Sequence, residues 1–291
     1  MSRITQLKRS LTDRRTHVEP WDGEERRTRI EGTRRFPDVA APSMWLLASE
    51  YRSIFEICAG LASIKTLSHL TPRGDGHPVM VLPGLSAADG STSLLRAFLD
   101  ALGYVTFGWG FGRNTGVTEE RILELRDRLD YIYELHGKKV SLIGHSLGGV
   151  YARELARLRP DLVRQVITLG SPFTGHPLAS TGTLLYEFLS GTKLNTLDFN
   201  RHLDMRIKPP VPVTSVYSKM DGVVAWQCSI EQRTETSESI NIRGCSHIGM
   251  GSAPTALYLI GERLSQEENK WMHFKPNGVQ QILYGIYDHL I

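Results

Sequence analysis

The sequence predicts an α/β fold with a mostly parallel central sheet, helices on both faces, a short helical lid and an N-terminal helical extension. From residue 78 onward, short apolar runs alternate with segments of helical periodicity, which is typical of parallel strands covered on both faces. The chain has 291 residues, of which 41% are hydrophobic and 22% charged, enough for a large core. This composition excludes a fully disordered, collagen-like or coiled-coil protein.

The charged residues divide the chain into regions. Residues 1–40 contain ten Arg or Lys and seven Asp or Glu and so carry the whole net charge of +3, whereas the other 251 residues contain 24 of each kind. We expect a mobile charged arm at 1–40, a helical extension at 41–77 and a main domain at 78–291. Acidic residues dilute the basic excess of the arm, so no nucleic-acid partner is expected.

A helix is predicted over 44–67, with Ser43 as its N-cap. Its apolar residues follow helical spacing, at Leu47, Tyr51, Ile54, Cys58 and Leu61. We expect this stripe to pack on the main domain, with contact to a lipid interface or to a partner as the alternatives. Charged residues exclude a membrane-spanning helix, namely Glu50, Arg52, Glu56 and Lys65.

Six strands are predicted in the main domain, at 79–82, 104–107, 140–143, 166–169, 213–217 and 239–242. The helices expected between and after them cover 91–102, 118–135, 147–158 and 254–264. An insertion at about 172–210 interrupts this alternation after a strand end, where a lid is expected. Its apolar residues predict a short helix, at Leu184, Leu185, Phe188 and Leu189.

The motif G-x-S-x-G follows the third predicted strand and precedes a helix. It reads Gly144-His145-Ser146-Leu147-Gly148. A serine on a sharp strand-to-helix turn needs neighbours without side chains two residues before and after it, and both are glycine. The start of the helix also favours a developing negative charge. Ser146 is therefore the predicted nucleophile.

A serine nucleophile requires a base and an acid, and both are found after later strands. Asp221 follows the strand at 213–217, and His247 follows the strand at 239–242. The carboxyl ends of parallel strands share one edge, so we expect Ser146, Asp221 and His247 to converge there. The alternatives are weaker, since they neighbour the serine, end a helix or lie in the insertion: His145, His136, His176, His202, Asp198 and Asp204.

Two main-chain N–H groups are required for the oxyanion of an acyl-transfer reaction. We expect them from Leu147, which follows the nucleophile, and from Leu85, because Gly84 permits the turn that directs its N–H. Candidate residues of the substrate pocket are Trp109, Phe111, Leu185 and Phe188. Glycines at 108, 110 and 112 do not complete a dinucleotide-binding motif, and no cofactor or metal is expected.

With its Gly-His-Ser-Leu-Gly-Gly elbow, the chain resembles the α/β-hydrolase superfamily, and within it bacterial lipases and carboxylesterases, over about residues 78–264. The resemblance implies a catalytic domain with Ser146, Asp221 and His247 as the triad and Leu85 and Leu147 as oxyanion donors. Many members carry His-Gly where this chain has Pro83-Gly84. The expected activity is that of a serine carboxylic-ester hydrolase, a lipase or lipid esterase with an acyl-enzyme intermediate. An acyltransferase with the same triad and a non-catalytic scaffold are the alternatives.

The N-terminus has no apolar stretch of signal-peptide type, so we expect a cytoplasmic protein, with peripheral membrane contact through the 44–67 helix as the alternative. No stretch of about 18 uncharged apolar residues is present. Three cysteines are too few for a disulfide scaffold, at Cys58, Cys228 and Cys245. Free thiols are favoured over a Cys228–Cys245 pair.

Overall fold

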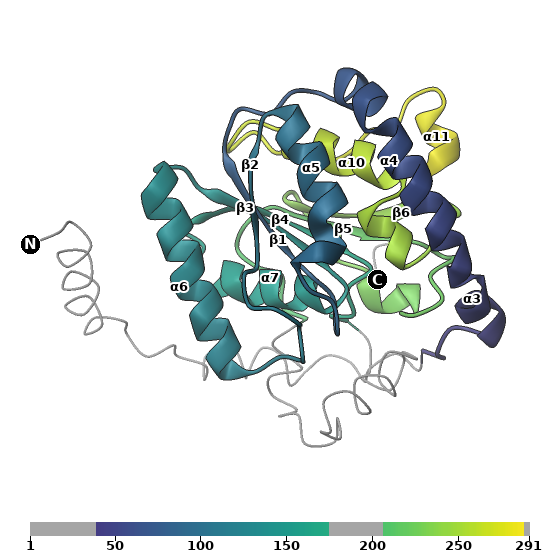
Figure 1. The fold of residues 1–291 in the computed structure, drawn as a ribbon, viewed down its shortest axis with the longest axis horizontal. Coiled ribbons are helices and arrows are strands. Elements are labelled where there is room, and N and C mark those ends of the chain that lie inside the picture. The colour runs from purple at the N-terminus through teal and green to yellow at the C-terminus, as the bar shows by residue number, and fades with distance from the viewer. Residues whose placement is uncertain (1–38, 175–205, 288–291) are drawn as a thin grey trace, which may run out of the picture. The chain divides into compact units, whose positions relative to one another are not determined.

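A seven-stranded sheet in the order β2-β1-β3-β4-β5-β6-β7 forms the centre of the molecule (Figure 1). The structure, a computed structural model, describes residues 39–174 and 206–287. Six strands are parallel: β1 Pro78–Leu82, β2 Val105–Gly108, β3 Val140–His145, β4 Val163–Leu169, β5 Val213–Tyr217 and β6 Ser237–Ile242. They confirm the six predicted strands. The seventh, β7 (Tyr284–Ile286), pairs antiparallel with β6 and was not predicted.

The two faces of the sheet bury separate hydrophobic clusters. Alternate residues of β1 point to opposite faces: Val79 and Val81 pack with α5 (Ser93–Leu102) and α10 (Pro254–Leu264). Met80 and Leu82 pack with α6 (Glu119–His136) and α7 (Leu147–Leu158). Figure 1 shows these helix pairs on the two sides of the sheet. Burial on both faces explains the continuous apolar run of β1. Strands β5 and β6 are also buried but carry polar side chains, among them Thr214, Ser215 and Glu238.

The extension consists of α3 (Met44–Ala48), the 3₁₀ turn η2 (Ser49–Arg52) and α4 (Ser53–Leu70). Ser43 caps α3, as predicted, and accepts a hydrogen bond from the N–H of Leu46 at 3.3 Å. Helix α4 packs against α10 and α5. Gly60 allows this approach, because a Cβ at this position would collide with the main-chain carbonyl of Ser252.

The face of the extension that packs is not the predicted apolar stripe. Tyr51, Ile54, Cys58 and Leu61 are exposed, and Leu47 is half-buried. The inner face instead carries the following residues: Glu50, Ser53, Gly60, Ile64, Leu67 and Ser68. The expectation of an inward stripe is wrong, because the polar inner side chains bind main-chain groups of the main domain, as described below.

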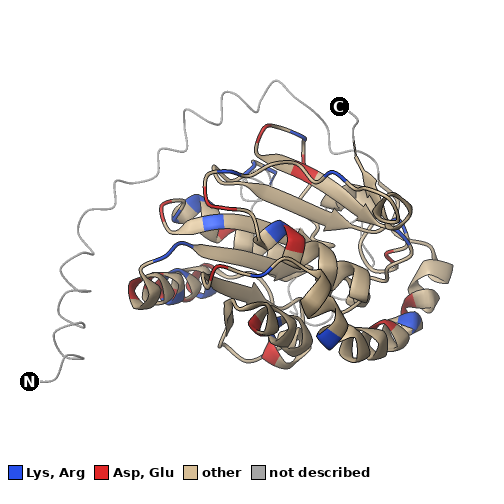
Figure 2. Ribbon diagram, turned by 90° about the horizontal axis from the view of Figure 1, so that it is seen from above, with Lys and Arg blue, Asp and Glu red and all other residues tan. Residues whose placement is uncertain are grey.

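The described residues of the extension and of the main domain belong to one compact unit. The lid helix expected in the insertion, and all but the end of the charged arm, lie outside the described residues. A short helix, α11 (Gln280–Leu283), leads into β7. All three cysteines are unbridged. Within the described ranges, no helix is long and apolar enough to cross a membrane. Basic and acidic residues are interspersed over the described ribbon (Figure 2).

Candidate active site

Ser146 lies between β3 and α7 in a strained backbone conformation, with φ 51° and ψ −122°. Non-glycine residues seldom adopt a positive φ, and strain of this kind is concentrated at functional sites. A Cβ at Gly144 would collide with the carbonyl oxygen of Gly148, and one at Gly148 with the carbonyl oxygen of Leu82. The two glycines of the motif are therefore required by close backbone approach around the serine.

Asp221 and His247 form a buried pair at the carboxyl ends of β5 and β6. Nδ1 of His247 lies 2.7 Å from Oδ2 of Asp221, and the two residues are 5% and 3% exposed. Oδ1 of Asp221 accepts hydrogen bonds from the N–H groups of Val223 at 2.8 Å and Val224 at 2.7 Å. These bonds fix the carboxylate so that its other oxygen faces the imidazole. The structure thus brings the predicted acid and base together.

The electrostatic surroundings favour a protonated His247. Burial acts to lower the pKa of His247, but the charge of Asp221, its hydrogen bond and the charge of Glu50 outweigh burial and raise the pKa above its ordinary value. A base whose charged form is stabilised in this way is suited to taking a proton during a reaction.

His145 connects the elbow to the loop that carries His247. Its Nε2 donates a hydrogen bond to the carbonyl oxygen of His247 at 2.9 Å, and the two rings lie 5.1 Å apart. Burial, with the neighbouring His247, lowers the pKa of His145 to about 4. The residue before Ser146 is therefore a neutral hydrogen-bond donor.

The turn after β1, which contains Leu85, is held by the buried Asn114. The side chain of Asn114 donates to the carbonyl of Pro83 at 2.9 Å, and its main chain exchanges hydrogen bonds with Ser86 and Ala87 at 2.7 and 2.8 Å. None of these three hydrogen bonds uses the N–H of Leu85. Asn114 was not predicted as a site residue, because a single asparagine in a glycine-rich loop is typical of an ordinary turn.

The extension also reaches the site. Glu50 accepts hydrogen bonds from the N–H groups of Gly222 and His247, and Glu56 from the N–H and hydroxyl of Ser246. Arg52 donates to the carbonyls of the residues before Asp221 and Ser246, at 2.6 and 3.2 Å. From the sequence, Glu50, Arg52 and Glu56 were used only to exclude a membrane-spanning helix. These three residues lie on the helix face opposite the apolar stripe, and this clustering is the signal that could have predicted their contacts with the main domain.

The candidate pocket residues have different positions. Trp109 is 1% exposed and packs in the core against Tyr151, with its Nε1 bonded to the carbonyl of Gly112 at 2.8 Å. It is a core residue, which corrects the expectation of a pocket wall. Phe111 is half-buried under the guanidinium of Arg121, 4.6 Å from the ring centroid. Leu185 and Phe188, with the alternative residues of the insertion, lie outside the described residues.

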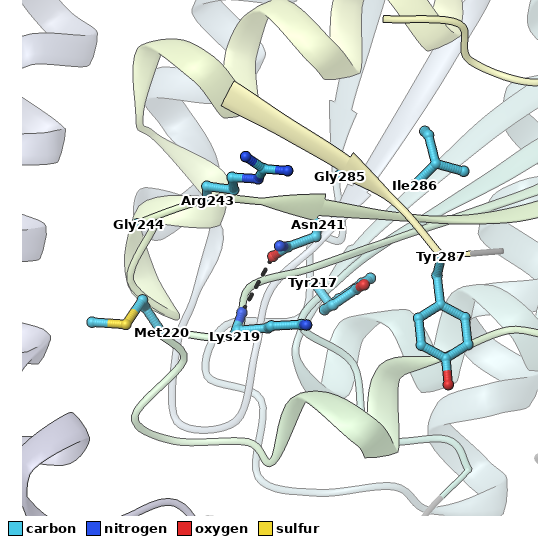
Figure 3. A pocket seen from close by; sticks show the side chains of 9 residues that line it. All are labelled: Tyr217, Lys219, Met220, Asn241, Arg243, Gly244, Gly285, Ile286 and Tyr287. Carbon is cyan, nitrogen blue, oxygen red and sulfur yellow. Dashed lines mark hydrogen bonds between the residues drawn. The ribbon is translucent and has the colours of Figure 1, made fainter. Parts of the chain in front are cut away.

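A cavity of about 540 Å³ lies between β7 and the loop after β5, which carries Asp221 (Figure 3). Its lining contains neither Ser146 nor His247. Two cationic side chains, Lys219 and Arg243, line it with Asn241, which accepts a hydrogen bond from the N–H of Lys219 at 3.3 Å. The aromatic side chains of Tyr217 and Tyr287 also border it. Lys219 and Met220, which precede Asp221 in the sequence, are part of the lining, but Asp221 itself is not.

The chain is similar to known proteins over part of its length. The model of a family described as PGAP1-like alpha/beta domain matches residues 118–234, a range that includes Ser146 and Asp221 and ends before His247. Lecithin-cholesterol acyltransferase-like 4 of Arabidopsis thaliana is 31% identical over 101 residues. This match covers 32% of this chain but only 19% of that protein.

Solved lipases share the fold. Aspergillus fumigatus lipase B superposes with a TM-score of 0.52 and 19% identity, over 67% of this chain and 53% of that one. Bacillus licheniformis lipase BlEst2 in its mature form superposes with a TM-score of 0.53 and 16% identity, over 67% of this chain and 94% of that one. With its parallel sheet and its strained serine between β3 and α7, the chain therefore has the α/β-hydrolase fold and resembles lipases of that fold.

Proposed function

We propose that the protein is a serine carboxylic-ester hydrolase, a lipase or lipid esterase. The observation that carries this proposal is the buried Asp221–His247 pair, bonded at 2.7 Å and connected by His145 to the strained elbow at Ser146. This combination provides a nucleophile, a base with a stabilised charged form, and an acid that orients the base.

In the proposed reaction, Oγ of Ser146 attacks the ester carbonyl while Nε2 of His247 takes its proton. Asp221 keeps the imidazole in the required tautomer and stabilises the imidazolium. His247 then protonates the departing alcohol, and an acyl group remains bonded to Ser146. Water, deprotonated by His247, attacks this acyl-enzyme and releases the carboxylic acid.

The tetrahedral intermediates carry a negative charge on the former carbonyl oxygen. We propose that the N–H groups of Leu85 and Leu147 bind this oxygen. Leu147 begins α7, where unpaired N–H groups and the helix dipole favour an anion. Losing one such donor typically lowers kcat by about 10²–10³-fold.

A lipid substrate is supported by the similarity to lipases and by the outer face of the extension. Large apolar side chains are exposed on α3, η2 and α4: Met44, Trp45, Tyr51, Ile54, Phe55, Leu61 and Leu70. Among Asp, Glu, Lys and Arg within 44–70, Lys65 alone is exposed, because Glu50 and Glu56 face inward. An apolar face without exposed carboxylates fits the surface of an anionic membrane.

The activity is tested with p-nitrophenyl esters of increasing chain length and an emulsified triglyceride. We expect hydrolysis that increases with acyl length and falls to the buffer rate in Ser146→Ala. Preference for short soluble esters would overturn the lipid assignment and leave the esterase. Hydrolysis retained in Ser146→Ala would overturn the mechanism.

Membrane contact is tested by sedimentation with vesicles of phosphatidylglycerol or phosphatidylcholine. We expect binding to the anionic vesicles that is lost in the double variant Trp45→Ser/Phe55→Ser. Tyr131, exposed on α6, provides the control variant Tyr131→Ser, which removes an apolar ring elsewhere on the surface. Equal binding by both variants would contradict the proposed contact.

An acyltransferase with the same triad is the second candidate, favoured by the similarity to the plant protein described as lecithin-cholesterol acyltransferase-like. In that case an alcohol replaces water in the second half-reaction. Product analysis in the presence of a competing long-chain alcohol distinguishes the hydrolase from the acyltransferase. Ester formation exceeding release of free acid at moderate alcohol concentration would favour the transferase.

A non-catalytic scaffold would retain the fold without a reactive serine. A fluorophosphonate probe tests this alternative, because it labels only an activated serine. Labelling that is lost in Ser146→Ala would exclude the scaffold, and its absence in the wild-type protein would favour it.

A further inference from the structure

Glu50 is a buried carboxylate that lies between the loop after β5, which carries Asp221 (the acid loop), and the loop after β6, which carries His247 (the base loop). It is 8% exposed, although glutamate is rarely buried without a partner. Its Oε1 accepts two main-chain hydrogen bonds, from Gly222 at 2.9 Å and from His247 at 3.0 Å. The N–H of Ile248 lies 3.4 Å from its other oxygen. A single side chain thus binds the residue after Asp221 and the main chain of His247 itself.

Glu50 contacts two loops that lie far from it in the sequence. Glu50 lies on η2, whereas Gly222 and His247 follow β5 and β6, 172 and 197 residues later. Nearby, Gly222 packs against the backbone of α3 so closely that a Cβ would collide with the carbonyl of Leu46. The extension therefore supports both loops from outside the sheet, at the point where the loops carry the two residues of the pair.

We infer that Glu50 is a positioning residue of the active site, which holds the Asp221 and His247 loops together and whose negative charge stabilises the imidazolium of His247. The inference rests on the proposed hydrolase function. Removing the acceptor would remove two main-chain hydrogen bonds beside the pair. Removing only the charge would weaken the attraction between Glu50 and the protonated ring.

The charged groups around His247 agree with this role. Among the described residues, those facing it are Asp221 after β5, Glu50 on η2 and His145 at the end of β3. The charges of Asp221 and Glu50 both raise the pKa of His247, against burial, whereas His145 is neutral at pH 7. Arg52 and Glu56 lie 3.9 Å apart and bind the main chain of the two loops.

Glu56 provides a matched comparison. It is also an inward carboxylate of the extension and accepts a hydrogen bond from the N–H of Ser246 at 3.0 Å, directly before the base. Its carboxylate lies 3.9 Å from the guanidinium of Arg52, which opposes its charge, whereas the charge of Glu50 raises the pKa of His247. If the extension acted only as a structural support, neutralising Glu50 or Glu56 would have similar consequences. If the charge of Glu50 acts on His247, only the neutralisation of Glu50 lowers the pKa of His247.

Four variants separate the two parts of the inference, and one of them, Glu56→Gln, is the matched comparison for Glu50→Gln. Glu50→Gln keeps Oε1 as the acceptor for the N–H groups of Gly222 and His247 and removes the charge together with the 3.4 Å contact to the N–H of Ile248, whereas Glu50→Ala removes all of them. Glu134→Gln, on the exposed surface of α6, controls for the change in net charge. For each protein we would measure the pH dependence of kcat/KM and titrate His247 by NMR of histidine-labelled protein, with His247→Gln used to assign the signal.

We expect Glu50→Gln to lower the pKa of His247, and with it the acid limb of kcat/KM, by about one pH unit. Glu56→Gln and Glu134→Gln should change neither the NMR titration midpoint of His247 nor the midpoint of the acid limb of kcat/KM. Glu50→Ala should lower kcat/KM by about 100-fold while its circular dichroism spectrum stays native, and Glu50→Gln should recover most of this loss.

Unchanged midpoints in Glu50→Gln would overturn the role of the charge, and kcat/KM within about twofold of wild type in Glu50→Ala would overturn the positioning role. If Glu50→Ala does not fold, the inference is tested by comparing Glu50→Gln with Glu56→Gln: a lower midpoint in Glu50→Gln alone supports it, and equal midpoints in the two variants overturn it. The NMR titration needs no substrate, so it tests the inference even if the wild-type protein hydrolyses no ester. In that event the proposed function fails separately.

Discussion

His145 donates a hydrogen bond from Nε2 to the carbonyl oxygen of His247 at 2.9 Å, which connects the residue before Ser146 to the proposed base. The acceptor is a carbonyl, so Nε2 must carry the hydrogen. Burial lowers the pKa of His145 to about 4, and this tautomer persists at neutral pH. The elbow at Ser146 and the loop that carries His247 are therefore linked by a neutral hydrogen-bond donor.

Replacing His145 with alanine should lower kcat/KM by about tenfold or more, because the base loop loses its link to the elbow. His145→Gln, which offers an amide donor, should recover part of the loss. Steady-state kinetics at pH 8 with one p-nitrophenyl ester measure both. Equal rates for wild type and His145→Ala would contradict the positioning role of this hydrogen bond.

The pH dependence of kcat/KM should show one acid limb, with a midpoint above about 6.5, the ordinary pKa of histidine. His247 must be neutral to take the proton of Ser146, and Asp221 raises its pKa against the effect of burial. Activity should therefore rise as pH increases through this raised pKa. Rates between pH 5 and 9 provide the measurement. A midpoint below 6, nearer the value of His145, would assign the limb to another group.

Gly170, at the end of β4, lies beside the acid–base pair and has φ 57°. A Cβ there would lie 3.0 Å from Nδ1 of His247 and 3.1 Å from Oδ2 of Asp221. Gly170→Ala should strain the backbone and separate the pair, lowering kcat by about 10–100-fold. The same change at Gly112, which has a positive φ and open space around it, controls for backbone strain alone. Similar losses in both variants would show that proximity to the pair is irrelevant.

Asn114→Ala should reduce kcat more than it changes KM. The side chain bonds the carbonyl of Pro83 and accepts from the N–H of Gly116 at 3.2 Å, so its loss loosens the turn that carries Leu85. An oxyanion donor acts mainly in the transition state, which places the effect on kcat. Unfolding in urea should also show a stability loss of about 2 kcal/mol, from the unpaired buried groups. A change confined to KM would contradict this assignment.

Most of the fold and the predicted triad follow from patterns that are local in the sequence. Strands buried on both faces appear as apolar runs, and the G-x-S-x-G motif marks the turn because both glycines are required by backbone contacts. Asp221 and His247 were found because parallel strands place their carboxyl ends on one edge. The three residues of β7 are too few to form a recognisable pattern, and the strand depends on pairing with β6.

The extension could not be predicted in the same way. Periodicity reveals that a helix has two different faces, and the apolar one is normally buried. Here Glu50 and Glu56 face inward because their carboxylates meet main-chain donors from loops 172–197 residues away. Such partners are specified only by the folded structure. Trp109 shows the same limitation, since a loop tryptophan next to glycines gave no sign that its ring enters the core.

The most direct test of the proposed mechanism is covalent labelling with a fluorophosphonate, followed by mass analysis of the intact protein and of its peptides. The proposed triad predicts one adduct per chain, located on Ser146, with labelling lost in Ser146→Ala and slowed at least about 100-fold in His247→Gln. An unlabelled wild-type protein, or an adduct that persists in Ser146→Ala, would contradict it.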